Sequence, residues 1–136
     1  MVYLTRRETF NAAHRLYNPK WSEEKNKAIF GKCSNPNYHG HNYELFVTIK
    51  GKVDADTGFV MNAHLLSKIV KEKIKDKVDH CNLNIDVHFM EGILPSTENF
   101  VIGIWNELEA SIKPFQLHKI RLKETENIYV DYFGES

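Results

Sequence analysis

The sequence contains only two cysteines, Cys33 and Cys81, among its 136 residues. With so few cysteines, a fold held together by several disulfides is not expected. Thiols stay reduced in the cytosol, so we expect no bridge between the two. Cys33 is therefore better explained as a reactive or metal-binding thiol, with a buried, inert cysteine as the alternative.

The chain has no net charge, because its 18 basic residues balance its 18 acidic residues. Nothing global therefore indicates a nucleic acid or an anionic membrane surface as partner. The first residues lack the apolar core of a secretory signal, and no apolar run reaches transmembrane length. There is no internal repeat or low-complexity segment. We expect a cytoplasmic protein that forms one domain over residues 1–136.

What the sequence does contain is a set of histidines that strand periodicity can bring together. His39 and His41 share their parity with Tyr43, so on a strand both imidazoles project from one face. His14 shares its parity with Phe10 in a second predicted strand. Pairing of the two strands would place three imidazoles around one metal ion.

Three neutral imidazoles suit Zn²⁺, at distances of about 2.0–2.1 Å, and leave a fourth position for water or substrate. We therefore expect a catalytic zinc site at His14, His39 and His41. In an alternative interpretation Cys33 is the fourth ligand of a closed, purely structural site. A zinc hydrolase that uses metal-bound water is a further alternative.

Hydrophobic periodicity predicts an α+β domain. Its predicted elements are strands over 5–14 and 41–50, helices that begin near Asn62 and near Ser96, and a hairpin over 120–132. We expect a four-stranded antiparallel sheet with both helices packed on one face. The polar connection 17–37 is expected to be a loop or to carry a short helix beside the active site.

Six segments resemble the 6-pyruvoyltetrahydropterin synthase family, which has the tunnelling fold of pterin-binding enzymes. The resemblance spans nearly the whole chain, and its segments are 10–16, 33–42, 57–62, 79–84, 96–99 and 123–125. It implies a zinc-dependent lyase of tetrahydrobiopterin biosynthesis, which converts 7,8-dihydroneopterin triphosphate to 6-pyruvoyltetrahydropterin and releases triphosphate.

The resemblance also assigns roles to individual residues. It places the zinc ligands at the three histidines already named and implies a catalytic thiol, a relay pair and a pterin-anchoring carboxylate at Cys33, Asp79, His80 and Glu124. Glu98 and Thr97 are further candidates for contacts with the pterin, although a capping or helix-dipole role also fits Glu98.

The residues themselves put conditions on two of these roles. Asp79 and His80 are adjacent, so their side chains can pair only at a turn or a helix end; otherwise Asp79 serves another partner. The alternative for His80 is an interaction with a helix dipole. Glu124 has the parity of Ile120 and Leu122 on a buried face. A buried carboxylate needs donors, and the N–H groups of a pterin would supply two.

A thiol base must lose its proton near neutral pH, so the pKa of Cys33 has to fall from its usual value, about 8.5. A nearby Zn²⁺ or protonated His80 could lower it. For the triphosphate we expect contacts from basic residues that flank the site, although each could be a solvated surface side chain: Arg15, Lys20, Lys25 and Lys32. We assign no chemical role to Tyr38 or Cys81, for which packing is expected.

The resemblance further implies a homohexamer, built as a dimer of trimers whose sheets close into barrels. This agrees with the two open edges of a four-stranded sheet, which assembly would pair. An alternative from the same fold is 6-carboxytetrahydropterin synthase of the queuosine pathway. The five residues between Cys33 and His39 favour the pyruvoyl enzyme, because the sister enzyme typically has a shorter gap.

Overall fold

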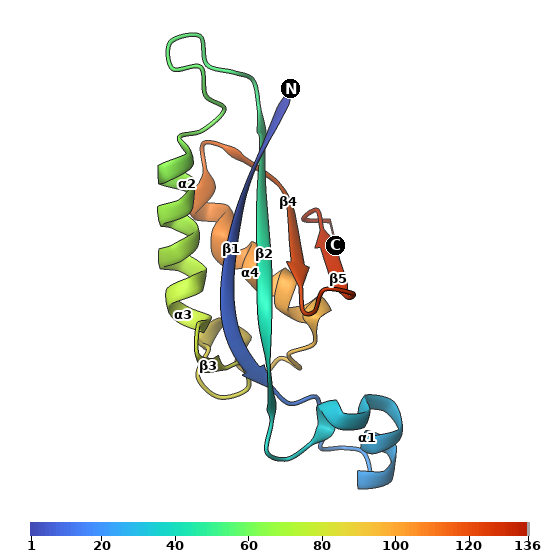
Figure 1. The fold of residues 1–136 in the computed structure, drawn as a ribbon. Coiled ribbons are helices and arrows are strands. Elements are labelled where there is room, and N and C mark those ends of the chain that lie inside the picture. The colour runs from blue at the N-terminus through green and yellow to red at the C-terminus, as the bar shows by residue number, and fades with distance from the viewer. Residues whose placement is uncertain (136) are drawn as a thin grey trace.

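The computed structural model describes residues 1–135, in which five strands form one twisted sheet (Figure 1). The strands are β1 (Val2–His14), β2 (His39–Gly51), β3 (Cys81–Asn82), β4 (Gln116–Lys123) and β5 (Tyr129–Tyr132), in the order β3-β1-β2-β4-β5. The four long strands are antiparallel, as predicted, and β4 and β5 form the predicted hairpin. The predicted count of four strands is wrong, because β3 runs parallel to β1 at one edge. A strand of two residues has no periodicity by which a sequence could reveal it.

The helices that cover the sheet come from two segments. The first runs through α2 (Ala63–Val70), the π-helical turn η2 (Lys71–Lys75) and α3 (Asp76–Val78), and the second is α4 (Thr97–Ile112). Both contribute to one core with the inward side chains of β1, β2 and β4. As predicted, these helices therefore lie on one face of the sheet, and Figure 1 shows α4 behind the strands with α2 beside it.

The core reflects the alternation of the strands. Tyr43, Leu45, Val47 and Ile49 of β2 are fully buried, as is Ala12 of β1. Burying these side chains against the helices stabilises the domain by roughly 25 cal/mol for each Å² of apolar surface removed from water. The same parity carries the histidines at the other end of the two strands to this inner face.

Both helical segments begin near the predicted residues, and each start has a side-chain cap. The side chain of Asn62 accepts hydrogen bonds from the backbone N–H groups of His64 and Leu65, and that of Ser96 accepts one from Asn99. These contacts satisfy N–H groups that have no partner inside the helix. The cap at Ser96 also fixes the chain just before α4, which borders the histidines.

Replacing Asn62 with alanine should lower the free energy of unfolding by about 1 kcal/mol, because the first turn of α2 loses its cap. Urea denaturation of the two proteins measures the difference. Asn62→Asp is the matched control, since aspartate caps as well as asparagine; a loss of the same size in both variants would contradict the capping role.

The long connection between β1 and β2 carries α1 (Glu23–Phe30) and the short 3₁₀ helix η1 (Gly31–Ser34), so the expectation of a short helix there is confirmed. Figure 1 shows α1 projecting beyond the end of the sheet. Tyr38 has a φ of +65°, in the left-handed region, and its N–H donates to the carbonyl of Asn35. This residue therefore makes the turn that starts β2 directly before His39.

The remaining irregular segments link the sheet to the helices. A further 3₁₀ helix, η3 (His88–Met90), lies in the connection that leads from β3 to α4. Among residues 1–135, no helix combines the length and the apolar character needed to cross a membrane.

Candidate metal and substrate site

The register of β1 and β2 brings the three predicted histidines together. His14 is paired with His39, and Ala12 with His41, so all three rings lie on the inner face. The Nε2 atoms of His14 and His39 are 3.0 Å apart, and the centroids of the three rings are separated by 4.6 to 5.0 Å. The periodicity of the two strands was enough to predict this cluster.

His14 is oriented by the segment that precedes α4. Its Nδ1 lies 2.9 Å from the carbonyl oxygen of Pro95, so Nδ1–H donates to this oxygen and Nε2 keeps its lone pair. Burial lowers the pKa of His14, and the nearby His39 and His41 lower it further. The pKa of His39 is also lowered, first by burial and then by His41. The lowered pKa values favour the neutral form of both rings, which a metal ion requires.

The residues present fit a zinc ion. Two nitrogens bound to one tetrahedral zinc at the usual length lie about 3.3 Å apart, close to the separation of the His14 and His39 Nε2 atoms. Within the described chain, His41 Nε2 is buried without a hydrogen bond. His14, His41 and Glu124 form one group of potential ligand atoms that lie within 4.8 Å of one another, and His14, Cys33 and His39 form a second.

Glu124 lies one residue beyond β4 and faces this cluster. Its Oε1 is 3.2 Å from His41 Nε2 and 3.5 Å from His14 Nε2, and its side chain is only 16% exposed. The sequence predicted that this inward carboxylate would need donors. In the structure the groups that face it are imidazoles, which places Glu124 on the metal side of the site.

Cys33 is held beside the histidines by the end of β1. Its carbonyl accepts a hydrogen bond from Leu16 N–H at 2.7 Å, and Arg15 Nε donates to the neighbouring carbonyl of Ser34 at 2.9 Å. Burial raises the pKa of the Cys33 thiol, and the charge of Glu124 raises it further. A cation bound in the site would act in the opposite direction, as a thiol base requires.

Asp79 and His80 meet at the helix end that their pairing was expected to need. His80 has a φ of +60°, and its Nδ1 lies 3.1 Å from Asp79 Oδ1. The same oxygen accepts the backbone N–H of Asn11 at 2.9 Å, so Asp79 also has the second partner considered above. The His80 side chain is 82% exposed, and neither residue belongs to the two groups of ligand atoms around His14.

The bond from Asn11 is the main cause of a lowered pKa at Asp79, and His80 lowers this pKa further. A carboxyl whose pKa is depressed by folding stabilises the native state above its unfolded pKa, about 3.9, and this contribution is lost as the pH falls through the folded pKa. Asp79→Asn should therefore destabilise the protein most at neutral pH, and the difference from wild type should shrink below pH 4. Urea titrations at several pH values measure this, with the exposed Asp56→Asn as control; a difference independent of pH would contradict it.

Thr97 and Glu98, the other predicted substrate contacts, lie in the first turn of α4 and differ in burial. Thr97 is buried there, two residues after the carbonyl that holds His14. Glu98 is exposed in the first turn, where its charge suits the helix dipole, and it is not part of either ligand group. Cys81 packs against the core, and both cysteines are free, as expected.

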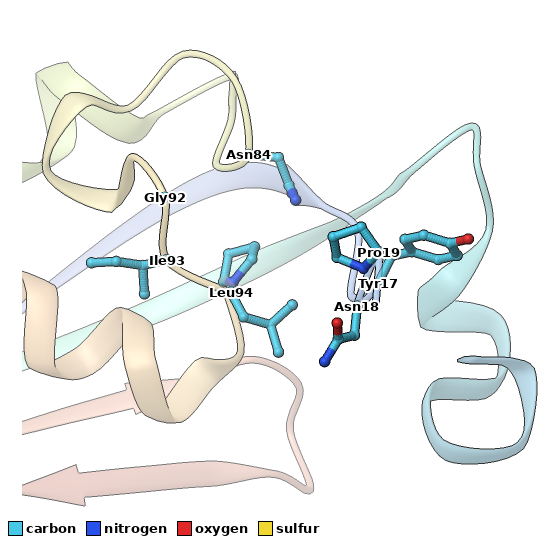
Figure 2. Close-up of a pocket in the computed structure, with 8 residues that line it drawn as sticks. Tyr17, Asn18, Pro19, Asn84, Gly92, Ile93 and Leu94 are labelled. Atoms are coloured by element: carbon cyan, nitrogen blue, oxygen red, sulfur yellow. The ribbon is translucent and has the colours of Figure 1, made fainter. Parts of the chain in front are cut away.

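A pocket of about 360 Å³ lies beside the cluster, on the side of Pro95. Figure 2 shows residues 92–94 facing Tyr17, Asn18 and Pro19 across it. The guanidinium of Arg15 lies over the ring of Tyr17, 3.9 Å from its centroid. A cationic side chain thus lies against one residue that lines the pocket, and Pro95, whose carbonyl holds His14, is another.

Three histidines with converging nitrogens, a thiol beside them and a carboxylate facing them form a candidate metal site on an α+β fold. The family model described as 6-pyruvoyl tetrahydropterin synthase matches residues 3–135. The chain belongs to this family of enzymes.

Individual relatives agree with this assignment. The 6-pyruvoyl tetrahydrobiopterin synthase of Dictyostelium discoideum is 52% identical over 134 residues, which cover 98% of this chain and 97% of the relative. The Homo sapiens protein of the same name is 43% identical over 132 residues, with 97% and 91% covered. The structure of Caenorhabditis elegans 6-pyruvoyl tetrahydropterin synthase superimposes with a TM-score of 0.92 at 38% identity, over 98% of this chain and 96% of that one.

The sequence did not indicate two features of this region, the contact that orients His14 and an unpartnered buried hydroxyl near His41. The carbonyl of Pro95 orients His14, and a main-chain oxygen leaves no trace in residue type. The hydroxyl of Tyr43 is buried without a hydrogen-bond partner among the described residues. Tyr43 does carry a signal, because it has the parity of His39 and His41 on β2.

Proposed function

We propose that the protein is a zinc-dependent lyase that converts 7,8-dihydroneopterin triphosphate to 6-pyruvoyltetrahydropterin and releases triphosphate. The observation that carries this proposal is the convergence of the His14, His39 and His41 side chains beside the Cys33 thiol. The high identity to synthases of this name supports the substrate and the pathway.

His14, His39 and His41 would hold the zinc ion, with Pro95 fixing the ring of His14. Bound zinc supplies a Lewis acid for oxygens of the substrate side chain, which makes neighbouring C–H protons easier to remove. Three protein ligands leave a position open to substrate, in contrast to a closed structural site.

Cys33 is proposed as the general base, whose Sγ takes a proton from a side-chain carbon of the substrate. Its position at the end of η1, tied to Leu16, keeps the sulfur within reach of the histidine cluster. Glu124 would orient the substrate beside the histidines, with its carboxylate accepting hydrogen bonds from N–H groups of the pterin or from the substrate side chain.

The Asp79–His80 pair is proposed to relay protons, with Asp79 setting the orientation of His80. His80 is largely exposed, so it can serve a site that another copy of the chain completes. We propose the homohexameric assembly of stacked trimers. The free edges of β3 and β5 support it, because they are the edges that a barrel would close.

The triphosphate is proposed to bind cationic side chains near the end of β1. Arg15 lies over the ring of Tyr17, which lines the pocket of Figure 2, and Lys25 lies over the ring of Trp21 in the adjoining α1 segment. Lys20 and Lys32 flank the same segment. If these residues bind the triphosphate, removing all four charges weakens substrate affinity; unchanged affinity would leave them as solvated surface groups.

The proposed function is tested with protein stripped of metal and protein reloaded with one zinc ion per chain. Incubation with 7,8-dihydroneopterin triphosphate, without added reductant, should release triphosphate only in the reloaded sample. Equal release in both samples would contradict a role for zinc, and no release in either would favour a purely structural metal site.

A further inference from the structure

We propose that Tyr43 is a positioning residue of the site, whose hydroxyl donates a hydrogen bond to the carboxylate of Glu124 when the histidines hold their metal ion. This proposal rests on the proposed function in one respect, the metal ion bound by the histidines. Tyr43 is fully buried, and its hydroxyl has no partner among residues 1–135.

The surroundings of the ring give no reason for a hydroxyl. Tyr43 stacks on Phe10 with centroids 5.1 Å apart and meets the edge of Phe100 at 5.5 Å. A phenylalanine would fill the same space without the cost of an unsatisfied buried hydroxyl, about 1–3 kcal/mol. A polar atom in such surroundings is expected to have a partner.

The sheet register ends one residue before this pair. Glu44 of β2 is paired with Lys123, the last residue of β4, and the same register extended by one residue would set Tyr43 opposite Glu124. The N–H of Glu124 still bonds to the carbonyl of Ile128, which continues the hairpin at this residue. Such cross-strand neighbours have Cβ atoms roughly 4.5–5.5 Å apart. The ring of Tyr43 also contacts that of His41, whose Nε2 faces the same carboxylate.

Metal binding would leave Glu124 in need of a hydrogen-bond donor, and Tyr43 has one to offer. In the structure described, the groups facing Glu124 Oε1 are the Nε2 atoms of His14 and His41. A nitrogen that gives its lone pair to a metal cannot share a proton with Glu124 through the same atom. A carboxylate with so little exposure then needs another donor, and the Tyr43 hydroxyl is a donor without an acceptor.

The kinetic test is Tyr43→Phe in the zinc-loaded protein. Loss of a hydrogen bond to a carboxylate should lower kcat about 10- to 100-fold, with a smaller change in KM and unchanged zinc content. Tyr132→Phe, on β5 and packed against Trp105, is the matched control and should behave as wild type. Tyr43→Phe with wild-type kcat would overturn the proposal.

Two comparisons identify Glu124 as the acceptor. If Tyr43 acts through Glu124, the double variant Tyr43→Phe/Glu124→Gln should be no slower than Glu124→Gln alone, within about twofold, whereas losses that multiply would overturn the assignment. Independently of turnover, NMR of the zinc-loaded protein should show a downfield hydroxyl proton that is absent in Tyr43→Phe and shifted in Glu124→Gln. A resonance that Glu124→Gln leaves unmoved would also overturn it. If wild type does not consume the substrate, the proposed function fails, and the NMR comparison still decides the role of Tyr43.

Discussion

Replacing Cys33 with alanine is expected to lower kcat by about 10²- to 10⁴-fold, the usual contribution of a general base. The three histidines are untouched by this substitution, so the variant should keep its zinc. The backbone contact that holds this segment, from Leu16 N–H to the carbonyl of residue 33, does not involve the thiol either. The fold and the metal should therefore survive the loss of turnover.

The measurement combines zinc content per chain with single-turnover kinetics. Cys81→Ala is the matched control, because that thiol is also half-buried and free but packs against the core at β3. If Cys33→Ala instead loosened zinc, Cys33 would be a fourth ligand and the closed, structural interpretation of the site would stand.

His39→Ala is expected to have the second large effect, a loss of zinc together with activity. One of three ligands disappears, so zinc affinity should fall by more than the roughly 10- to 100-fold that follows loss of a group that only orients a ligand. His39 is a cleaner target than His14, because His14 is fully buried and also bonds to Pro95. Replacing His39 should thus lower the folding stability less than replacing His14.

Competition with a coloured zinc chelator measures the affinity of the His39 variant. The exposed His64→Ala serves as control, since this residue lies in the first turn of α2, away from the cluster. Zinc affinity equal to that of wild type in His39→Ala would remove this residue from the ligand set.

The parts of the site that the sequence predicted depend on strand periodicity. His14, His39 and His41 could be placed on one inner face because two long strands alternate regularly. The role of Glu124 came from the family resemblance, and its parity with Leu122 indicated only that it faces inward. The helix starts near Asn62 and Ser96 could also be predicted from the sequence. A side chain that accepts hydrogen bonds from the first N–H groups of a helix acts locally.

The remaining features depend on tertiary contacts or on the backbone. The two residues of β3 form a strand only because they pair with Ala12 and Ala13. The pairing of Asp79 with His80 depends on the left-handed backbone conformation of His80. The sequence did not indicate this conformation, because no glycine occupies the position. The acceptor that orients His14 is the main-chain carbonyl of Pro95. The acceptor proposed for Tyr43 depends on the register of β2 and β4.

The most direct test of the account is the mass of the pterin that the zinc-loaded protein forms from 7,8-dihydroneopterin triphosphate. We predict 6-pyruvoyltetrahydropterin, with one triphosphate released for each substrate consumed. Formation of the 6-carboxy product with acetaldehyde would contradict the assigned reaction and place the chain with the sister activity, although the histidines and Cys33 would keep their roles.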